Sequence, residues 1–265
     1  MAIPVPSNHP TATRGGGKKH GPMKMPRVFL TAEWLNLVML NYAVDPSLLS
    51  RFVPLGTELD SFEGVTYLSL IGFEFNRTRM AGFAIPFHAS FEEVNLRFYV
   101  RRGSRRGVVF IRELVPRRAV AAVARFAFGE NYACVPMAHA IRTQPGIDAI
   151  AAEYSWGAGE GQCTMQLEAS GPWVLPAEGS RGQFITEHYW GYAAQPGDGC
   201  LEYEVQHPRW GIRQACSAGF AGDAASYYGR EFAETLVGEP NSAFLAEGSA
   251  VTVFKGARIE IRDQR

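Results

Sequence analysis

The sequence predicts a mainly β protein that folds as a single domain with a few helices. Most apolar stretches after Arg27 alternate with polar residues at the period of a β-strand. Joints rich in Pro and Gly near residues 145, 171 and 196 separate these stretches as turns would. All-β domains of about 200 to 250 residues are common, and a chain of 265 residues agrees with that size.

The first predicted elements are a long strand and a short helix. The run VFLTAEWLNLVMLNYAV, residues 28–44, is a long apolar strand candidate. Asp45 is a suitable helix N-cap and Pro46 suits the first helical position, so DPSLLSRFVP predicts a short helix that ends at Pro54. The next run, GVTYLSLIGFEFNRTRM over residues 64–80, predicts a second long strand.

A hairpin is predicted next. EEVNLRFYVRR over 92–102 and GVVFIRELVP over 107–116 are two strand patterns joined by a short turn that contains Gly103. No aromatic residues interleave with the arginines of this turn, so the pattern favours a solvated loop tip over a phosphate-binding patch. These arginines are Arg101, Arg102, Arg105 and Arg106.

The first strand of this hairpin has one apolar and one polar face. The apolar residues from Val94 to Val100 alternate with a polar set that includes Glu93, Asn95 and Arg97. The polar face of an antiparallel strand commonly meets water. If it instead meets a cavity, we expect the three side chains to hold one another by charge-assisted hydrogen bonds.

One longer helix and several strands complete the prediction. The helix begins near Pro116, runs through RRAVAAVARFAF and stops at Gly129. The strands that follow are predicted to pair mostly antiparallel. Their ranges are 135–143, 147–156, 162–170, 203–217 and 250–261.

Charge and hydropathy restrict the classes of partner. The chain has 26 basic and 26 acidic residues and a formal net charge of zero, which argues against nucleic-acid binding and against a polybasic membrane surface. No run approaches the roughly 18 apolar residues of a membrane span. We therefore expect a small-molecule ligand, no nucleic acid and no membrane partner, while a homo-oligomer stays open.

The cysteines and the N-terminus indicate a cytoplasmic protein. The four cysteines form no C-x-x-C pair and have no histidine at a metal-ligand spacing, which predicts reduced thiols with no metal and no cofactor. Residues 1–25 lack the apolar core of a signal peptide and predict a disordered tail. Translation could start at Met1, Met23 or Met25. The cysteines are Cys134, Cys163, Cys200 and Cys216.

Two histidines lie in aromatic surroundings. His188 stands in FITEHYWGY and His207 in VQHPRWGIR, and such clusters line many small-molecule pockets. The same pattern fits hydrogen-bonded residues in an aromatic-rich core. No G-x-S-x-G, H-E-x-x-H or EF-hand pattern is present, which argues against serine hydrolases, zincins and EF-hand proteins.

Several long segments resemble a known family. The segments FEEVNLRFYVRR, GVVFIRELVPR, TEHYWGY and HPRW, together with most of residues 29–75, resemble the uncharacterised YqjF-like family of the acetoacetate decarboxylase-like superfamily. The resemblance extends from Phe29 to Arg258. It implies a closed antiparallel β-barrel with an internal cavity and a few peripheral helices, formed by residues 26–265.

The decarboxylase chemistry does not carry over with the resemblance. Arg125 matches the motif arginine, but the position of the Schiff-base lysine falls near Tyr132. Ala32 stands where those enzymes have a second arginine, while Glu93 in FEEV matches their active-site glutamate. Beyond the tail the chain has a single lysine, Lys255, so we expect no Schiff-base decarboxylation.

Three hypotheses about function follow. In the first, the cavity binds a small carboxylate or carbonyl compound, with Glu93 as acid–base group or hydrogen-bond acceptor. In the second, an enzyme of another class, such as a hydratase, isomerase or hydrolase, uses Glu93 and a histidine. In the third, aromatic residues such as Trp190 fill the barrel of a structural or assembly protein. The ligand-binding residues expected under the first hypothesis are Asn95, Arg97, Tyr132, His188 and Tyr189.

Overall fold

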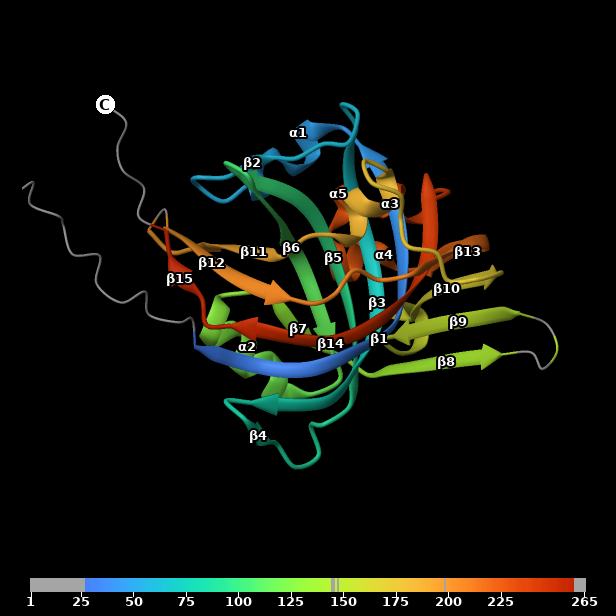
Figure 1. The fold of residues 1–265 in the computed structure, drawn as a ribbon, viewed down its shortest axis with the longest axis horizontal. Helices are drawn as coiled ribbons and strands as arrows, with labels where there is room; N and C mark the ends of the chain where they lie inside the picture. Colours follow the sequence, from blue (N-terminus) through green and yellow to red (C-terminus); the bar gives the residue numbers. More distant parts are fainter. Residues whose placement is uncertain (1–26, 144–145, 147, 198, 260–265) are drawn as a thin grey trace, which may run out of the picture.

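The computed structural model describes residues 27–259 except 144–145, 147 and 198. Within this part of the chain, strands dominate and are joined in one strongly curved sheet (Figure 1). The prediction of a mainly β protein is therefore confirmed. The predicted tail, residues 1–25, lies outside the described residues.

Seven strands form a continuous path of hydrogen-bonded neighbours that returns on itself. The order is β12-β11-β6-β5-β3-β1-β14, and β14 pairs again with β12 at Val205–Val253 and Gln206–Thr252. We call these seven strands the strand ring. Its members are β1 Val28–Val44, β3 Thr66–Met80, β5 Phe91–Arg102, β6 Arg105–Val115, β11 Trp190–Gln195, β12 Gly199–Gln206 and β14 Ser242–Phe254.

A second layer of strands packs against the outside of the ring. It continues from β14 through β13, β10 and β9 to β8 (Figure 1). Leu96 of the ring shares a buried apolar core with Tyr154 and Met165 of this outer sheet. The outer strands are β8 Met137–Thr143, β9 Ala149–Trp156, β10 Cys163–Ser170 and β13 Ile212–Gly222.

Short strands and helices cover the ends of this framework. The strands β2, β4, β7 and β15 pair with β5, β3, β6 and β12, respectively. The short strands are β2 Glu58–Leu59, β4 Phe83–Ala84, β7 Tyr132–Cys134 and β15 Ala257–Arg258. The helices are α1 Pro46–Leu49, α2 Arg118–Phe128, α3 Arg181–Thr186, α4 Ala224–Tyr228 and α5 Arg230–Val237, with 3₁₀ turns at Ser50–Phe52 and Gly159–Gly161. No described helix combines the length and apolar character needed to cross a lipid bilayer.

Both predicted helices form where their caps indicate. The Asp45 side chain accepts a hydrogen bond from the Ser47 amide and begins α1. Gly129 ends α2 in the left-handed conformation, with φ of 71°, and its amide donates to the Arg125 carbonyl. This cap fixes where the chain leaves α2, next to the cavity described below.

The arginine-rich turn is solvent-exposed, as predicted, and its arginines form ion pairs. Its guanidinium groups are paired with carboxylates of neighbouring elements, although their side chains are about 40–50% exposed. Arg106 also lies over the Phe184 ring. The ion pairs are Arg101 with Glu58, Arg102 and Arg105 with Glu202, and Arg106 with Asp60.

Two predicted strands have different limits in the structure. The pattern over 203–217 predicts one strand, but β12 ends at Gln206 and β13 begins at Ile212. Pro208 lies in the gap, and it has no amide to donate to a sheet. The strand predicted over 250–261 starts earlier, since β14 covers Ser242–Phe254, and residues 260–261 lie outside the described residues.

Candidate functional site

The strand ring surrounds a cavity of about 290 Å³. All seven ring strands, α2 and the segment after α3 contribute residues to its wall, and most of that wall is apolar. Trp190 and Trp210 line the cavity but do not fill it, which argues against a fully packed interior. The aromatic lining includes Phe29, Trp34, Phe73, Phe75, Phe91, Phe110, Phe128, Tyr132, Trp190, Tyr203 and Trp210.

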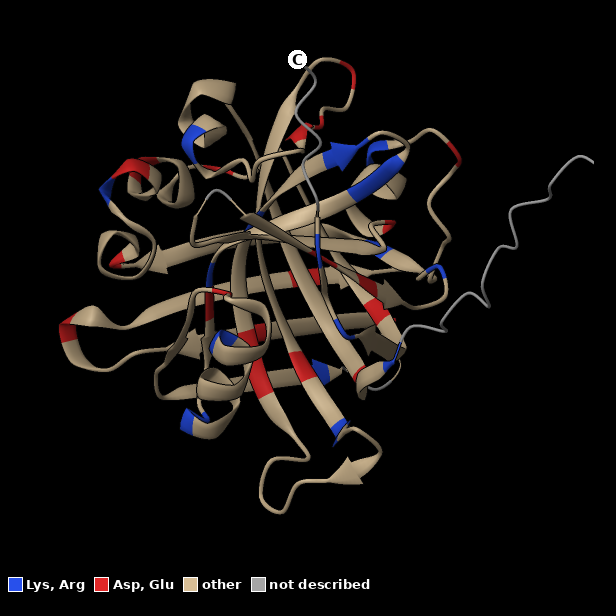
Figure 2. Cartoon of the chain, turned by 90° about the vertical axis from the view of Figure 1, so that its left-hand side faces the viewer, with Lys and Arg blue, Asp and Glu red and all other residues tan. Residues whose placement is uncertain are grey.

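The alternating strand of the sequence, β5, is buried on both faces. Val94, Leu96 and Phe98 belong to the core shared with the outer sheet. Glu93 and Asn95, only 3% and 2% exposed, line the cavity together with Arg97. The polar face therefore lines the cavity. Figure 2 shows several acidic residues within strands.

A bulge in β6 adds a second carboxyl to this wall. Val109 and Ile111 face the outer core, so strict alternation would direct Glu113 outward as well. The β5–β6 register shifts by one residue between the pairs Leu96–Arg112 and Arg97–Phe110. This bulge reverses the alternation, and Glu113 faces the cavity opposite Asn95.

A third carboxyl comes from the segment after α2. Gly129 turns the chain at the helix end, and Glu130 follows with a buried side chain that lines the cavity. Tyr132 in β7 then pairs with Glu113 across the parallel β6–β7 contact. One strand, one bulge and one helix cap thus place three glutamates on one cavity.

Two tyrosines and an asparagine hydrogen-bond to these carboxyls. The Tyr132 hydroxyl donates to Glu93 Oε2 at 3.0 Å, and Asn95 Nδ2 donates to Glu93 Oε1 at 3.1 Å. The Tyr203 hydroxyl donates to Glu130 Oε1 at 2.9 Å. Within the described residues, Glu113 Oε2 and Asn95 Oδ1 are buried without a partner.

Burial raises the pKa of all three carboxyls. Desolvation raises the pKa of Glu93 to about 7, against hydrogen bonds from Asn95 and Tyr132 and the charge of Arg97. Burial also raises the pKa of Glu130 to about 8. For Glu113 the pKa lies well above the usual range, because of burial and then the charges of Glu130 and Glu93. Burial therefore favours the protonated form of all three groups, and it does so least for Glu93.

Arg97 and His188 add buried nitrogen atoms without hydrogen-bond partners among the described residues to the cavity wall. Arg97 Nη2 donates to the Ile185 carbonyl at 3.2 Å, and its buried Nε has no partner among the described residues. The structure therefore does not confirm a hydrogen bond between Arg97 and either Glu93 or Asn95. This is because the guanidinium extends toward the segment that follows Phe184.

His188 is buried beside Arg97 and not beside the glutamates. Its ring lies 4.6 Å from the Tyr99 ring and 5.5 Å from the Phe184 ring, measured between centroids. Neither ring nitrogen has a hydrogen-bond partner in the described part of the chain. Burial, and then the charges of Arg97 and Arg106, hold the pKa of His188 well below its usual value, so the ring is neutral.

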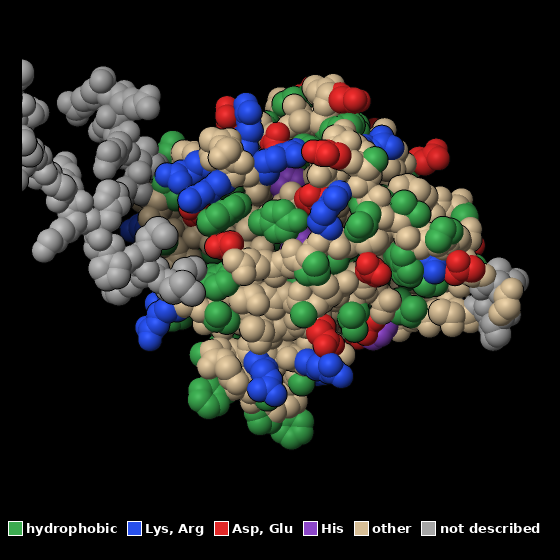
Figure 3. Space-filling model, viewed as in Figure 1, with side chains coloured by type: hydrophobic (Ala, Val, Ile, Leu, Met, Phe, Trp, Pro, Cys, Tyr) green, Lys and Arg blue, Asp and Glu red, His purple; other side chains and the backbone are tan. Residues whose placement is uncertain are grey.

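The other predicted aromatic residue, Tyr189, does not line the cavity. Its ring lies 4.9 Å from His207, which stacks at 4.0 Å on Trp210, and these two rings form the wall. Tyr189 is thus separated from the cavity by His207. In the view of Figure 3, histidine side chains are only partly visible between their neighbours.

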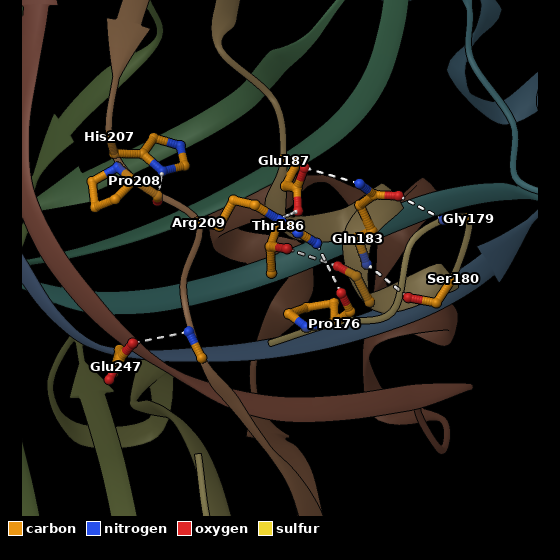
Figure 4. A network of polar contacts seen from close by, with 12 residues as sticks. Pro176, Gly179, Ser180, Gln183, Thr186, Glu187, His207, Pro208, Arg209 and Glu247 are labelled. Atoms are coloured by element: carbon orange, nitrogen blue, oxygen red, sulfur yellow. Dashed lines mark hydrogen bonds and ion pairs between the residues drawn. The ribbon is translucent and has the colours of Figure 1, made fainter. Parts of the chain in front are cut away.

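A polar network fixes the chain segments on both sides of this aromatic stack. Arg209 pairs with Glu187 and donates to the Pro176 carbonyl at 2.8 Å (Figure 4). Gln183 donates to the other oxygen of Glu187 at 3.0 Å. These contacts join α3 to the segment between β12 and β13, and they hold His188 and His207 near each other.

Of the predicted site residues, five line the cavity together. They are Glu93, Asn95, Arg97, Tyr132 and His188. The sequence interpretation missed Glu113, Glu130, Tyr203 and Trp34. A charged residue inside the apolar run GVVFIRELV was a signal for Glu113, whereas no sequence signal places Tyr203 in the cavity.

The positions aligned with decarboxylase residues lie in different environments. Arg125 is exposed on α2, and Ala32 is buried in β1 without lining the cavity. Lys255, the single lysine among the described residues, is exposed just after β14 and does not line the cavity.

Comparisons with known proteins agree with this fold. The model of the DUF2071 family, described as an uncharacterized conserved protein, matches residues 31–250. No curated protein matches the chain. The expected resemblance to an uncharacterised protein family is thereby confirmed.

Solved structures with the same fold have low sequence identity. An acetoacetate decarboxylase-like enzyme from Sphingomonas wittichii RW1 matches with a TM-score of 0.64 and 13% identity, covering 94% of this chain and 100% of the other. The enduracididine biosynthesis enzyme MppR, complexed with pyruvate, matches with a TM-score of 0.66 and 13% identity over 92% and 95%. Acetoacetate decarboxylase from Legionella pneumophila matches with a TM-score of 0.63 and 11% identity over 94% and 98%.

Proposed function

This chain belongs to the DUF2071 family of uncharacterized conserved proteins, and we propose that it binds a small organic molecule in its cavity. The strand ring then acts as a closed barrel around the ligand. The observation that carries the proposal is an open cavity whose buried polar groups lack partners. Buried polar groups in proteins are nearly always hydrogen-bonded, so these groups favour a ligand that supplies the missing bonds.

The ligand in this proposal has an apolar body and a carboxylate or carbonyl group. The aromatic wall accommodates the body, as in most small-molecule sites. Arg97 Nε and the neutral His188 ring receive the oxygen atoms, because a guanidinium is a strong donor to carboxylates. MppR, which has the same fold, was solved with pyruvate, which contains both groups.

Schiff-base chemistry is not part of this proposal. The only described lysine is exposed outside the cavity wall, and an arginine cannot form the imine. We therefore expect that borohydride reduction in the presence of a β-keto acid leaves no adduct on the protein. A stable adduct on Lys255 would overturn this expectation.

A thermal-shift and calorimetry experiment tests ligand binding. The probes are phenylacetate and phenylacetone, which share one aromatic body and carry a carboxylate and a ketone. A ligand at a concentration of a hundred times its Kd should raise the free energy of unfolding by about 2.7 kcal/mol, and this gain should appear as a clear rise in Tm. Val108 lines the cavity, so Val108→Phe should fill part of it and weaken both probes.

A matched pair of arginine variants tests the anchor. Arg97→Gln should weaken phenylacetate at least tenfold and phenylacetone less, because it removes the charge that pairs with the carboxylate. Arg142→Gln, on the exposed face of β8, should change neither. Absence of binding by both probes, or binding that Val108→Phe leaves intact, would contradict the proposal.

Proton transfer is the second candidate function, as in a hydratase or isomerase. The observation that favours it is Glu93, whose pKa of about 7 suits an acid–base group and which accepts a hydrogen bond from Tyr132. His188 is beside Arg97, so Tyr132 and not this histidine is the partner of Glu93. In D₂O, the protein should exchange the α-protons of phenylacetone, and Glu93→Gln should abolish this exchange.

A further inference from the structure

The acidic end of the cavity has no cation of its own. Glu93, Glu113 and Glu130 come from different segments of the chain, and all three are more than nine-tenths buried. None of them takes part in any ion pair described between residues 27 and 259. Buried acidic groups in proteins are normally paired or neutralised by protons.

When the carboxyls are ionised, two unpartnered atoms at this end are hydrogen-bond acceptors. Tyr132 and Tyr203 already donate to Glu93 and Glu130. Within the described residues, Glu113 Oε2 and Asn95 Oδ1 have no donor, and Asn95 is 2% exposed. Glu113 and Asn95 are opposite one another in the β5–β6 ladder, so the two acceptors line the same part of the cavity.

This arrangement selects among the possible donors. A hydroxyl group supplies one hydrogen and no charge, whereas a primary ammonium supplies three hydrogens and a positive charge. The described residues form no group of three acidic, histidine or cysteine ligands that could hold a metal ion. An ammonium therefore donates hydrogen bonds to the two acceptors, and its positive charge compensates the negative charge of the ionised carboxyls.

We propose that the acidic end, formed by Glu93, Asn95, Glu113 and Glu130, binds the ammonium group of a small amine with an apolar body. This inference rests on the proposed small-molecule function and narrows its ligand class. Arg97 lies farther along β5 and hydrogen-bonds to the Ile185 carbonyl, and it forms no ion pair with a described carboxyl of the acidic end. A ligand that also carries a carboxylate could engage both ends.

Isothermal titration calorimetry with probes that share one body tests the inference. The probes are 2-phenylethylamine, 2-phenylethanol and phenylacetone, measured on the full chain at pH 6, 7 and 8. We expect the amine to bind at least tenfold more tightly than the alcohol at pH 8. Because the cation favours ionised carboxylates, it should displace protons, and its Kd should fall by up to about tenfold per pH unit for each proton released.

The groups that face the bound ammonium determine this pH dependence. They are Glu93 on β5, Glu113 on β6, Glu130 after α2, and the phenols Tyr132 and Tyr203. Both phenols have a pKa raised well above 10 by burial and by the neighbouring carboxyls, so they stay neutral over this range. The proton release measured in two buffers of different ionisation enthalpy therefore reports the carboxyls.

Variants separate this inference from general binding. Glu113→Gln preserves size and should reduce amine binding at least tenfold while leaving 2-phenylethanol within about twofold. Glu153→Gln, on β9 of the outer sheet, is the matched control and should change neither. Circular dichroism shows whether Glu113→Gln folds; if it does not, the pH series and proton release of the unmodified chain decide.

The outcomes distinguish the two proposals. If phenylacetone or phenylacetate binds but the amine does not, the ammonium inference fails and the proposed function stands. If the amine binds no better than the alcohol, or binds more weakly as the pH rises, the inference is likewise overturned. If no probe binds, both fail.

Discussion

Single residues at the acidic end determine how stability depends on pH. Burial raises the pKa of Glu93 from 4.5 to about 7, so the folded state holds a proton that the unfolded chain releases above pH 4.5. The contribution of Glu93 to the stability of the fold is therefore greatest below about pH 4.5, and it decreases as the pH rises to about 7. The loss is about 3 kcal/mol for a shift of this size. Denaturant unfolding at pH 5, 6 and 8 should show the free energy of unfolding decreasing.

The variant Glu93→Gln tests whether Glu93 causes this dependence of stability on pH. Without the titrating carboxyl, the curve should be flatter, and at pH 8 the variant should be at least as stable as the unmodified chain. Glu153→Gln should keep the full slope. A curve for Glu93→Gln as steep as that of the unmodified chain would contradict this assignment.

At this scale the sequence predicted one strand face well. Alternation alone placed Glu93, Asn95 and Arg97 together, and it could not distinguish water from a cavity, since both suit a polar face. Glu113 was missed because a one-residue bulge reverses alternation, and bulges follow from pairing with a partner strand. Tyr189 was expected on the wall because sequence distance cannot show that His207 intervenes.

At the scale of elements, the contact between β6 and β11 depends on glycine. The two strands pair in parallel at only two positions, Trp190–Gly107 and Gly191–Val108. A Cβ at Gly107 would lie 2.6 Å from the Trp190 carbonyl oxygen, closer than atoms in contact can approach. Gly107→Ala should therefore destabilise the fold by about 1–3 kcal/mol, measured by urea unfolding.

Gly219→Ala in β13 is the matched control for this contact. A Cβ there has nothing within 4 Å, so the change should stay within about 0.5 kcal/mol. Equal effects of the two substitutions would mean that strand propensity, and not the β6–β11 approach, sets the cost.

The same scale shows which elements can be found in a sequence. The strand β1 and the caps of α1 and α2 were predicted because local signals such as Asp45, Pro46 and Gly129 determine them. The short elements β11, α3 and α4 were missed, since five or six residues carry little periodicity. The start of β14 was missed because its first half is rich in small residues and contains Gly248, whose backbone adopts φ of 81°.

For the whole molecule, β5 joins two apolar cores. Its outward face packs with the outer sheet, and its inward face lines the cavity. Leu96 is fully buried in the core shared with the outer sheet, so Leu96→Ala should lower the free energy of unfolding by about 2–5 kcal/mol.

Because both cores share ring strands, we expect residues 26–265 to unfold as one domain. Hydrogen exchange should then show the same loss of protection in β9 of the outer sheet and in β12 of the ring. The Leu175 side chain is about half exposed, so the control Leu175→Ala should change the free energy of exchange in β9 and in β12 by no more than about 0.5 kcal/mol. Loss of protection in β9 alone would instead separate the outer sheet from the ring as an independent unit.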